Sequence, residues 1–234
     1  MPEEKKYGEL FVVSTPIGNL GDISERALNC LRAVEIIACE DTRHTGFLLS
    51  RFDIKKRLIS YNDVNAIKRL PVLLDFLGDG KNVAVVSDAG TPGVCDPAYR
   101  IVRSAIDSGF EVKSIPGASA VLSALVVSGL PLDRFVFEGF LPQKGAARSK
   151  RIELLKNEPR TIIFYESPYR IINLLDSLFE ILGDREISVS RELTKLHEET
   201  IRGTVGDVLS QLKNKNPRGE YTVVVRGTGK KGSS

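Results

Sequence analysis

Residues 82–93 read Asn-Val-Ala-Val-Val-Ser-Asp-Ala-Gly-Thr-Pro-Gly, and this segment carries the strongest structural signal in the chain. Val83 to Val86 form a short, continuous, apolar run, which is typical of a strand buried on both faces of a parallel sheet. The residues that follow favour turns and let a ligand approach the backbone closely. Because ligands of open α/β sheets bind outside the carboxyl ends of strands, residues 87–94 are the first candidate for a ligand-binding loop. The same composition also fits an ordinary strand-to-helix turn.

The sequence on either side of this segment alternates between apolar strand-like runs and amphipathic helical runs. Before residue 130 we expect strands at 10–14, 35–39, 57–60, 83–86 and 111–115, and helices at 22–31, 66–77, 97–108 and up to 128. Such alternation predicts an α/β domain with a mostly parallel sheet and helices on both faces.

The pattern changes after residues 129–133, Gly-Leu-Pro-Leu-Asp, which are the best candidate for a linker. Beyond them we expect strands at 135–139, 161–165, 186–190, 200–203 and 221–226, with helices ending near 182 and covering 205–213. The short, hairpin-like spacings predict a second α/β domain with a mixed sheet. The expected domains are therefore 1–130 and 134–228, and the tail from Thr228 through 229–234 is expected to be disordered.

Composition favours a globular chain and excludes several classes of site. Hydrophobic residues make up 42% of the 234 residues, and the formal net charge of +3 permits a polyanionic partner without indicating one. The three cysteines, Cys30, Cys39 and Cys95, lack zinc-binding spacing and fit a reducing cytoplasm. With only two histidines, no histidine-based metal site is expected. The charged N-terminus and the lack of an apolar run near ~18 residues argue against a signal peptide and a membrane span.

Several polar residues near strand ends allow both a structural and a functional interpretation. Asp22 with Glu25 has the spacing of a capping box, and Asp96 is an expected N-cap. Glu40-Asp41-Thr42-Arg43 follows the second expected strand, where it would either serve a site or cap the next helix through Thr42. The basic stretch 141–156 is either a solvated helix face or a contact with phosphates.

Seven short motifs, taken together and in order, resemble the tetrapyrrole methylase family, and within it the branch of the ribosomal RNA small subunit methyltransferases I. The resemblance covers the chain from about residue 10 to 226. The motifs are Thr15-Pro-Ile-Gly-Asn-Leu20, Glu40-Asp-Thr-Arg43, Ser87-Asp-Ala-Gly-Thr-Pro92, Pro116-Gly-Ala-Ser-Ala120, Gly139-Phe-Leu-Pro142, Glu166-Ser-Pro-Tyr-Arg170 and Arg191-Glu-Leu-Thr-Lys195.

The resemblance implies an S-adenosylmethionine-dependent enzyme that produces a 2′-O-methylated cytidine in small-subunit (16S) ribosomal RNA. It also implies a homodimer of chains with two α/β domains and the cofactor in the cleft between them. Relatives that act on tetrapyrroles usually carry a Gly-x-Gly-x-Gly-Asp loop and a Gly-Asp-Pro turn, whereas this chain has Thr15 to Asn19 and Gly90-Thr91-Pro92. These departures favour the RNA branch. Many branch members continue into a C-terminal extension, which would strengthen RNA binding.

The resemblance also assigns roles to individual residues, and no role calls for a metal. Cofactor binding falls to Ile17, Asp88, Gly90, Thr91, Val94, Ser119, Ala120, Glu166 and Gly203. The candidates for activating a ribose 2′-hydroxyl are Asp41, Glu40, Lys195 and Glu198, with Arg43 beside them. From their chemistry alone, Arg43 and Arg170 would suit an RNA phosphate, and the basic spacing of Lys144, Arg148 and Arg151 suggests that they also hold RNA. The alternative is that Arg43–Asp41 and Lys195–Glu198 are structural ion pairs.

Two other functions stay open from the sequence. The acceptor would be a tetrapyrrole-like small molecule if the same fold and cofactor served the other branch. The chain would be a non-catalytic protein if it only sensed adenosylmethionine or docked on the ribosome. For the RNA methyltransferase, the sequence leaves open whether the partner is ribosomal RNA alone or the assembled small subunit.

Overall fold

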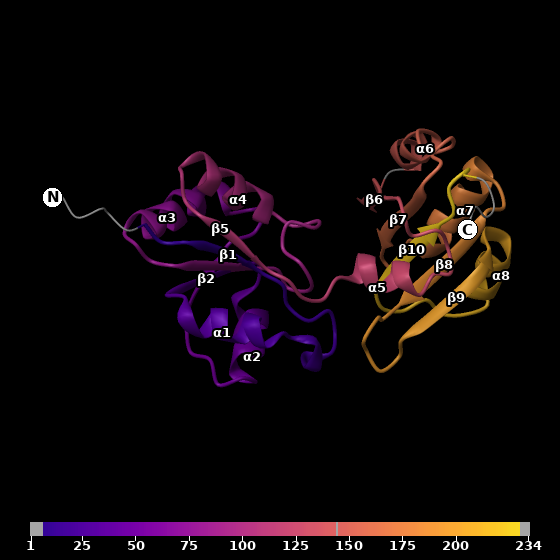
Figure 1. Cartoon of the computed structure of the whole chain (residues 1–234). Coiled ribbons are helices and arrows are strands. Elements are labelled where there is room, and N and C mark those ends of the chain that lie inside the picture. The colour runs from indigo at the N-terminus through magenta and orange to yellow at the C-terminus, as the bar shows by residue number, and fades with distance from the viewer. Residues whose placement is uncertain (1–6, 144, 230–234) are drawn as a thin grey trace. The chain divides into compact units, whose positions relative to one another are not determined.

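The computed structural model describes residues 7–143 and 145–229, which fall into two compact units that divide between Ser119 and Ala120 (Figure 1). The sequence suggested a boundary further along, at residues 129–133. The difference is the helix α5 (Ala120–Val126), which packs against the strands β8 (Glu186–Arg191) and β10 (Tyr221–Val225) of the second unit. Val121, Ala124 and Leu125 of this helix are buried, and its contacts with β8 and β10 assign it to the second unit.

The first unit is built on a parallel sheet with the strand order β3-β2-β4-β1-β5. This order confirms the α/β fold class expected for the N-terminal half. The apolar run at residues 83–86 forms the central strand, which has hydrogen-bonded neighbours on both sides. The strands are β1 (Leu10–Val13), β2 (Ile36–Cys39), β3 (Arg57–Ser60), β4 (Val83–Val86) and β5 (Val112–Ile115).

Helices cover both faces of this sheet, as Figure 1 shows. On one face, Val83 and Val85 join a buried cluster with residues of α3 (Ala66–Gly78) and α4 (Ala98–Asp107). On the other face, Ala84 and Val86 join a cluster with residues of α1 (Glu25–Ala33) and α2 (Thr42–Ser50). Side chains alternate between the two faces of a strand, so a strand covered on both sides must be apolar throughout.

All three expected helix caps are different in the structure. Ser24, and not Asp22, caps α1 by accepting the backbone N–H of Ala27 at 3.1 Å; Asp22 lies in the short 3-10 helix η1 (Leu20–Asp22). Asp41, and not Thr42, caps α2, because Asp41 has the extended backbone of an N-cap and Thr42 is already helical. Pro97, and not Asp96, is the N-cap residue of α4, although the carboxylate of Asp96 still accepts the backbone N–H of Ala98 at 2.8 Å.

The second unit has a mixed sheet with the strand order β6-β7-β10-β8-β9, as the sequence predicts. The pair β6/β7 is parallel and the remaining pairs are antiparallel. The remaining elements are β6 (Phe135–Phe140), β7 (Thr161–Glu166), β9 (Glu199–Thr204), α6 (Gly145–Glu153), α7 (Ile171–Leu182) and α8 (Val205–Lys213).

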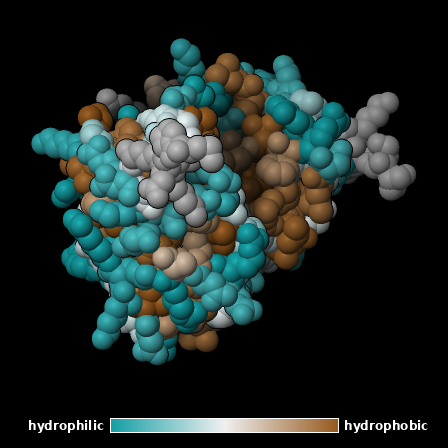
Figure 2. Space-filling view, turned by 60° about the vertical axis from the view of Figure 1, so that its left-hand side comes forward, coloured by the Kyte–Doolittle hydropathy of each residue, from teal (hydrophilic) through white to brown (hydrophobic). Residues whose placement is uncertain are grey.

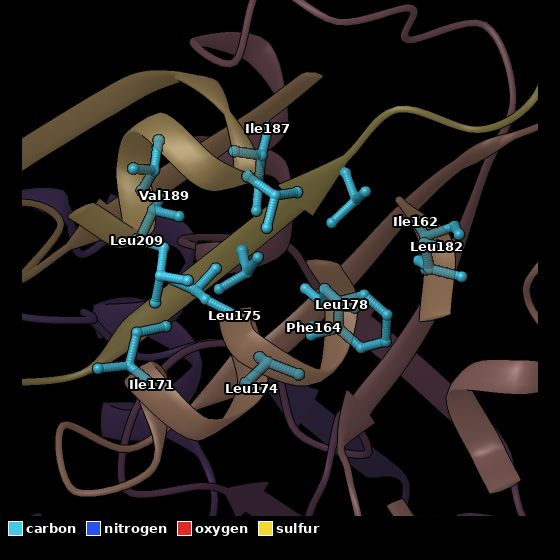
Figure 3. Close-up of a cluster of buried hydrophobic side chains, with 14 of the residues drawn as sticks. Ile162, Phe164, Ile171, Leu174, Leu175, Leu178, Leu182, Ile187, Val189 and Leu209 are labelled. Atoms are coloured by element: carbon cyan, nitrogen blue, oxygen red, sulfur yellow. The ribbon is translucent and has the colours of Figure 1, made fainter. Parts of the chain in front are cut away.

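The core of this unit lies between the sheet and the helices α6, α7 and α8. Phe164 of β7 is fully buried in it, among the leucines of α7 and the valines of β8 and β10. Figure 3 shows Phe164 close to Leu178, with Leu174 and Leu175 on the same helix facing the sheet. The buried residues of α5 do not belong to this cluster, so α5 covers the opposite face of β8 and β10.

The chain beyond β10 is tied to the second unit by backbone hydrogen bonds. Thr228 donates to the carbonyl of Glu158 at 2.8 Å and Gly229 to that of Pro159 at 3.2 Å. The disorder expected from Thr228 onward therefore does not hold for these two residues, and residues 230–234 lie outside the described part.

Hydrophilic residues cover much of the face drawn in Figure 2, with hydrophobic residues exposed between them. Large apolar side chains that are well exposed include Phe47, Val64, Ile67, Val126 and Phe140. Among the described residues, no helix combines the length and the apolar character needed to cross a bilayer.

Candidate functional site

The strand order of the first unit creates a switch point at the carboxyl end of β4. The helix that follows β4 covers one face of the sheet, whereas the helices that follow its neighbours β1 and β2 cover the other. The loops after these strands consequently diverge, and in open α/β sheets this is where ligands bind. The loop predicted from residues 87–94 lies at this point.

The loops after β1, β4 and β5 are joined by a set of hydrogen bonds. Thr15 and Gly90 exchange two backbone hydrogen bonds, of 2.9 and 3.1 Å. The hydroxyl of Thr91 donates to the carbonyl of Ala118 at 3.2 Å and lies 3.0 Å from the hydroxyl of Ser14. Gly90 and Thr91, which the sequence predicts to bind the cofactor, are thus joined by hydrogen bonds to residues 14–15 and 118.

Glycine at position 90 is required by both conformation and space. Its φ of +80° lies in the left-handed region, and a Cβ there would come within 3.2 Å of Cγ2 of Ile17. The structure therefore brings Ile17 and Gly90, both predicted to bind the cofactor, into contact. Together with the buried hydroxyls of Ser14 and Thr15, they form a cradle of small residues and backbone amides. Such a cradle fits a ligand without phosphate groups.

Two carboxylates connect the loops after β2 and β4. The backbone N–H of Asp88 donates to Oε1 of Glu40 at 3.3 Å, and Oδ1 of Asp88 accepts the N–H of Asp41 at 3.1 Å. The pKa of Glu40 is raised to about 6, mainly by burial and also by the negative charges of Asp88, Asp96 and Asp63, against the opposing effect of the hydrogen bond from the backbone of Asp88. Glu40 is thus a carboxylate that accepts a proton near neutral pH.

Asp41 and Arg43 form an exposed ion pair beside this cluster. Nη2 of Arg43 lies 2.7 Å from Oδ2 of Asp41, and the Arg43 side chain is 90% exposed. Hydrogen bonds from Arg43 hold the pKa of Asp41 well below its usual range. This geometry agrees with the structural alternative for the pair, and Asp41 also caps α2.

Glu40→Gln is expected to change the pH dependence of stability. The folded chain binds a proton at Glu40 more tightly than the unfolded chain, where the pKa is near its ordinary 4.5. The wild type therefore loses stability as pH rises from about 4.5 to 6, whereas glutamine keeps the hydrogen-bond acceptor and does not ionise. Thermal unfolding between pH 4 and 8 should show the variant gaining in Tm relative to the wild type over this window. A constant difference in Tm would contradict the assignment.

In the second unit, Glu166 and Arg170 are partners of each other. The carboxylate of Glu166 is buried, accepts the N–H of Ser167 at 2.7 Å and lies 2.7 Å from Nη2 of Arg170. Arg170 is consequently not the free cation expected for an RNA phosphate, because its charge is already matched by a carboxylate. Both residues hold the loop that precedes α7.

Lys195 is paired with glutamates other than the one expected. Its Nζ lies 2.9 Å from Oε1 of Glu192 and 3.0 Å from Oε2 of Glu220. Burial lowers the pKa of Lys195, but the hydrogen bonds to both carboxylates outweigh it, so the net shift is upward. Glu198, the partner that the sequence suggested, accepts the backbone N–H of Thr194. Lys195 is therefore a cation in the folded chain, which opposes a role as a base.

The other predicted cofactor residues have the following places. Val94 lies in the bend between β4 and α4 with 36% of its surface exposed. Ser119 follows β5, and Ala120 begins α5. Gly203 lies in β9 opposite Ile187 and next to Asp207 of α8.

The described part of the basic stretch is mostly exposed, as a solvated face is, but one of its arginines is buried. Arg151 pairs with Glu138 at 2.7 Å, and Arg148 is buried, with 8% of its surface exposed. Lys144 lies outside the described residues. The sequence did not reveal the burial of Arg148, which precedes Ile152 by one helical turn, because an arginine on a basic helix is ordinarily exposed.

Sequence reasoning missed an asparagine pair at the same edge of the first sheet. Asn62 donates its N–H to Oδ1 of Asn65 at 2.9 Å, and Asn65 donates its N–H to Oδ1 of Asn62 at 3.3 Å. The side-chain amide of Asn62 also lies 3.4 Å from the carbonyl of Glu40. The cluster of asparagines directly after β3 was the available signal. Within the described ranges, no group of three or more His, Cys, Asp or Glu side chains is arranged to hold a metal.

Comparison with known proteins agrees with this arrangement. The family model of the tetrapyrrole (corrin/porphyrin) methylases matches residues 9–209. The chain is 49% identical to "Ribosomal RNA small subunit methyltransferase I" of Thermotoga maritima, over 94% of this chain and 99% of that protein. It is 44% identical to the protein of the same name from Escherichia coli O157:H7, over 96% of this chain and 79% of the relative.

Solved structures show the same fold at low sequence identity. The uroporphyrin-III-C-methyltransferase of Thermus thermophilus has a TM-score of 0.65 at 20% identity, covering 93% of this chain and 94% of its own. The methyltransferase CobJ has a TM-score of 0.71 at 19% identity, covering 97% of each chain. The chain therefore belongs to the tetrapyrrole methylase family, in the branch whose curated members are named ribosomal RNA small subunit methyltransferase I.

Proposed function

We propose that this protein transfers the methyl group of S-adenosylmethionine to the ribose 2′-hydroxyl of a cytidine in small-subunit ribosomal RNA. The observation that carries the proposal is the similarity, over 94% of the chain, to relatives named for methylation of that RNA. The cradle at Gly90 adds physical support, because its small residues and backbone amides suit a nucleoside that carries no phosphate groups. The solved tetrapyrrole methylases share the fold alone, so they do not favour a tetrapyrrole acceptor.

The first unit supplies the clearest cofactor residues. Ile17, Gly90 and Thr91 line the cradle, and the carboxylate of Asp88 is a suitable acceptor for a hydroxyl or amino group of the nucleoside. When bound, the cofactor provides an electrophilic methyl group on a sulfonium. The residues of the chain must hold it at near-attack distance from the acceptor and keep water out, which contributes about 7–11 kcal/mol in favourable cases.

Glu40 is the best proton acceptor among the four residues that the sequence suggested. A 2′-hydroxyl becomes a better nucleophile when a base takes its proton as the new O–C bond forms. A suitable base has a pKa near the working pH, and the pKa of Glu40 is raised to about 6. Asp41, with its lowered pKa, and Lys195, with its raised pKa, are poorer bases. For Lys195 we propose electrostatic positioning of the acceptor.

The experiment is transfer of a labelled methyl group to purified small subunits and, separately, to protein-free ribosomal RNA. We expect label in 2′-O-methylcytidine after digestion to nucleosides. Label on a base, or none on either RNA substrate, would reject the proposal. Transfer to a tetrapyrrole, or adenosylmethionine binding without transfer, would support the two alternatives. The comparison of the two RNA substrates decides whether the assembled subunit is needed.

Substitutions should separate the roles of the candidate residues. Glu40→Gln is expected to lower the transfer rate by about 10²-fold or more while cofactor affinity is retained, because one general base contributes about that much. Asp41→Asn, which keeps the helix cap, should be nearly as active as the wild type. Lys195→Ala should lose activity and Lys195→Arg should retain part of it, because arginine keeps the charge. Single-turnover rates and calorimetric Kd values provide the measurements, and full activity of Glu40→Gln would remove it as the base.

The proposal includes the homodimer that the resemblance implies. It also includes action in the cytoplasm, because ribosomal subunits are assembled there. Sedimentation of the purified chain would test the dimer.

A further inference from the structure

The guanidinium of Arg148 lacks the partners that a buried cation needs. The residue is 8% exposed, and Nη2 donates to the carbonyl of Gln143 at a long 3.4 Å. Nε and Nη1 have no hydrogen-bond partner within residues 7–143 and 145–229. Leaving a buried charge without a partner is strongly unfavourable, so a compensating group is expected at this point.

Other arginines of the same unit show how the fold normally satisfies this side chain. Arg185 is partly buried and donates from all three nitrogens to the backbone carbonyls of Leu182, Arg226 and Lys156. Arg151, three residues after Arg148 on the same helix, lies 2.7 Å from the carboxylate of Glu138. Arg148 differs from both. Among the described residues, its guanidinium donates only to the carbonyl of Gln143, and it has no carboxylate partner.

The free donors of Arg148 lie beside the start of α6. The helix begins at Gly145, so Arg148 belongs to its first turn, and helical side chains tilt toward the N-terminus. The contact with Gln143, which precedes the helix, fixes the guanidinium there. The first N–H groups of a helix lack intrahelical partners and carry a partial positive charge. Two independent sets of donors therefore converge on one place.

The packing of α6 keeps this arrangement rigid. Arg148 and Ile152 are one turn apart and are the buried residues of the helix, so both face inward. Ile152 packs in the core with Leu141, which directly follows β6. The guanidinium consequently lies near the carboxyl end of β6.

We propose that Arg148 and the N-terminus of α6 form a binding site for a single phosphate group. A guanidinium fork and free helix N–H groups both match phosphate oxygens, and the anion would neutralise the buried charge. The identification of the phosphate as one phosphodiester of the RNA substrate rests on the proposed function. The phosphate chemistry of the site rests on the donors alone.

The first test uses inorganic phosphate and the full chain. Thermal unfolding is measured in phosphate and in chloride at equal pH and ionic strength, for the wild type, Arg148→Met and the matched control Arg151→Met. We expect phosphate to raise the Tm of the wild type and of Arg151→Met, and to give a smaller rise for Arg148→Met. The comparison of variants is essential because phosphate also stabilises proteins generally by exclusion from their surface. In chloride, Arg148→Met should be at least as stable as the wild type, because no unpaired charge is buried.

The second test distinguishes RNA phosphodiesters from free phosphate. Loss of one phosphate contact should reduce the slope of log K against log salt for RNA binding by about 0.7–0.9 in Arg148→Met, and by less in Arg151→Met. Inorganic phosphate should compete with RNA for the wild type more strongly than for Arg148→Met. If the slope is unchanged while the phosphate effect on Tm is lost, the site takes free phosphate and the RNA assignment is rejected. A wild type that fails to methylate RNA would reject the proposed function without affecting the first test.

Equal rises in Tm for all three proteins would overturn the proposal. If Arg148→Met does not fold, the test is a titration of phosphate into the wild-type protein labelled with ¹⁵N-arginine, followed by NMR. A shift of the Arg148 Nε resonance that saturates with added phosphate would support the site, and no shift would overturn it.

Discussion

Gly90→Ala is expected to weaken adenosylmethionine binding by about tenfold or more. A Cβ at this position would lie 3.2 Å from Cγ2 of Ile17, and alanine is strained at a φ of +80°. Left-handed backbone costs about 1–2 kcal/mol for a residue with a Cβ, and 1.4 kcal/mol corresponds to a factor of ten in affinity. The strain would displace the loop from its backbone pairing with Thr15. Isothermal titration with the cofactor or its demethylated product measures the change.

Gly93→Ala is the matched control for this experiment. Gly93 lies in the same loop with a similar φ of +89°, but a Cβ there would have nothing within 4 Å. We expect its affinity for the cofactor to stay within about twofold of the wild type, because the strain is not transmitted to the cradle. Equal losses in both variants would show that loop strain matters and that contact with Ile17 does not.

Phe164→Ala is expected to destabilise the second unit by about 3–5 kcal/mol, the usual cost of removing a buried phenylalanine ring. Phe164 is fully buried at the centre of the core drawn in Figure 3. Since domains are stable by only about 5–15 kcal/mol, this loss is a large part of the total. Urea unfolding followed by circular dichroism would show it as a lower midpoint for one transition.

Phe140→Ala is the control for the loss of an aromatic ring. Phe140 is 54% exposed and contacts Tyr165 at a centroid distance of 5.5 Å. The expected cost is about 0.5–1.5 kcal/mol, which is the usual value of an aromatic pair. A similar cost for both variants would contradict the assignment of Phe164 to the core.

The strands and helices could be predicted from the sequence because each has a strong local pattern. The run at residues 83–86 is apolar on both faces, and β4 has the predicted bounds. Helix caps were less predictable, since Ser24 and Asp22 are both good capping residues and only the backbone conformation selects between them. The unit boundary was displaced because α5 reads as one more helix of an alternating pattern, and only its packing against β10 assigns it.

The residues of the candidate site also differ in how far the sequence predicts them. Gly90 and Thr91 were predictable, because turn chemistry after a buried strand is a local signal. The partners of charged residues were not, because they come from distant parts of the chain. Glu220 is 25 residues from Lys195 in sequence, and no local pattern marks it as a partner. The buried state of Arg148 emerged only from the structure, because the packing of α6 on the core determines it.

The hydroxyl of Thr91 bridges two loops that are far apart in sequence, and this has a thermodynamic consequence for ligand capture. Loops that are already fastened to each other have few alternative conformations to lose when a small molecule arrives. Association should then proceed as docking onto a preformed surface, with little conformational entropy lost in ordering the polypeptide.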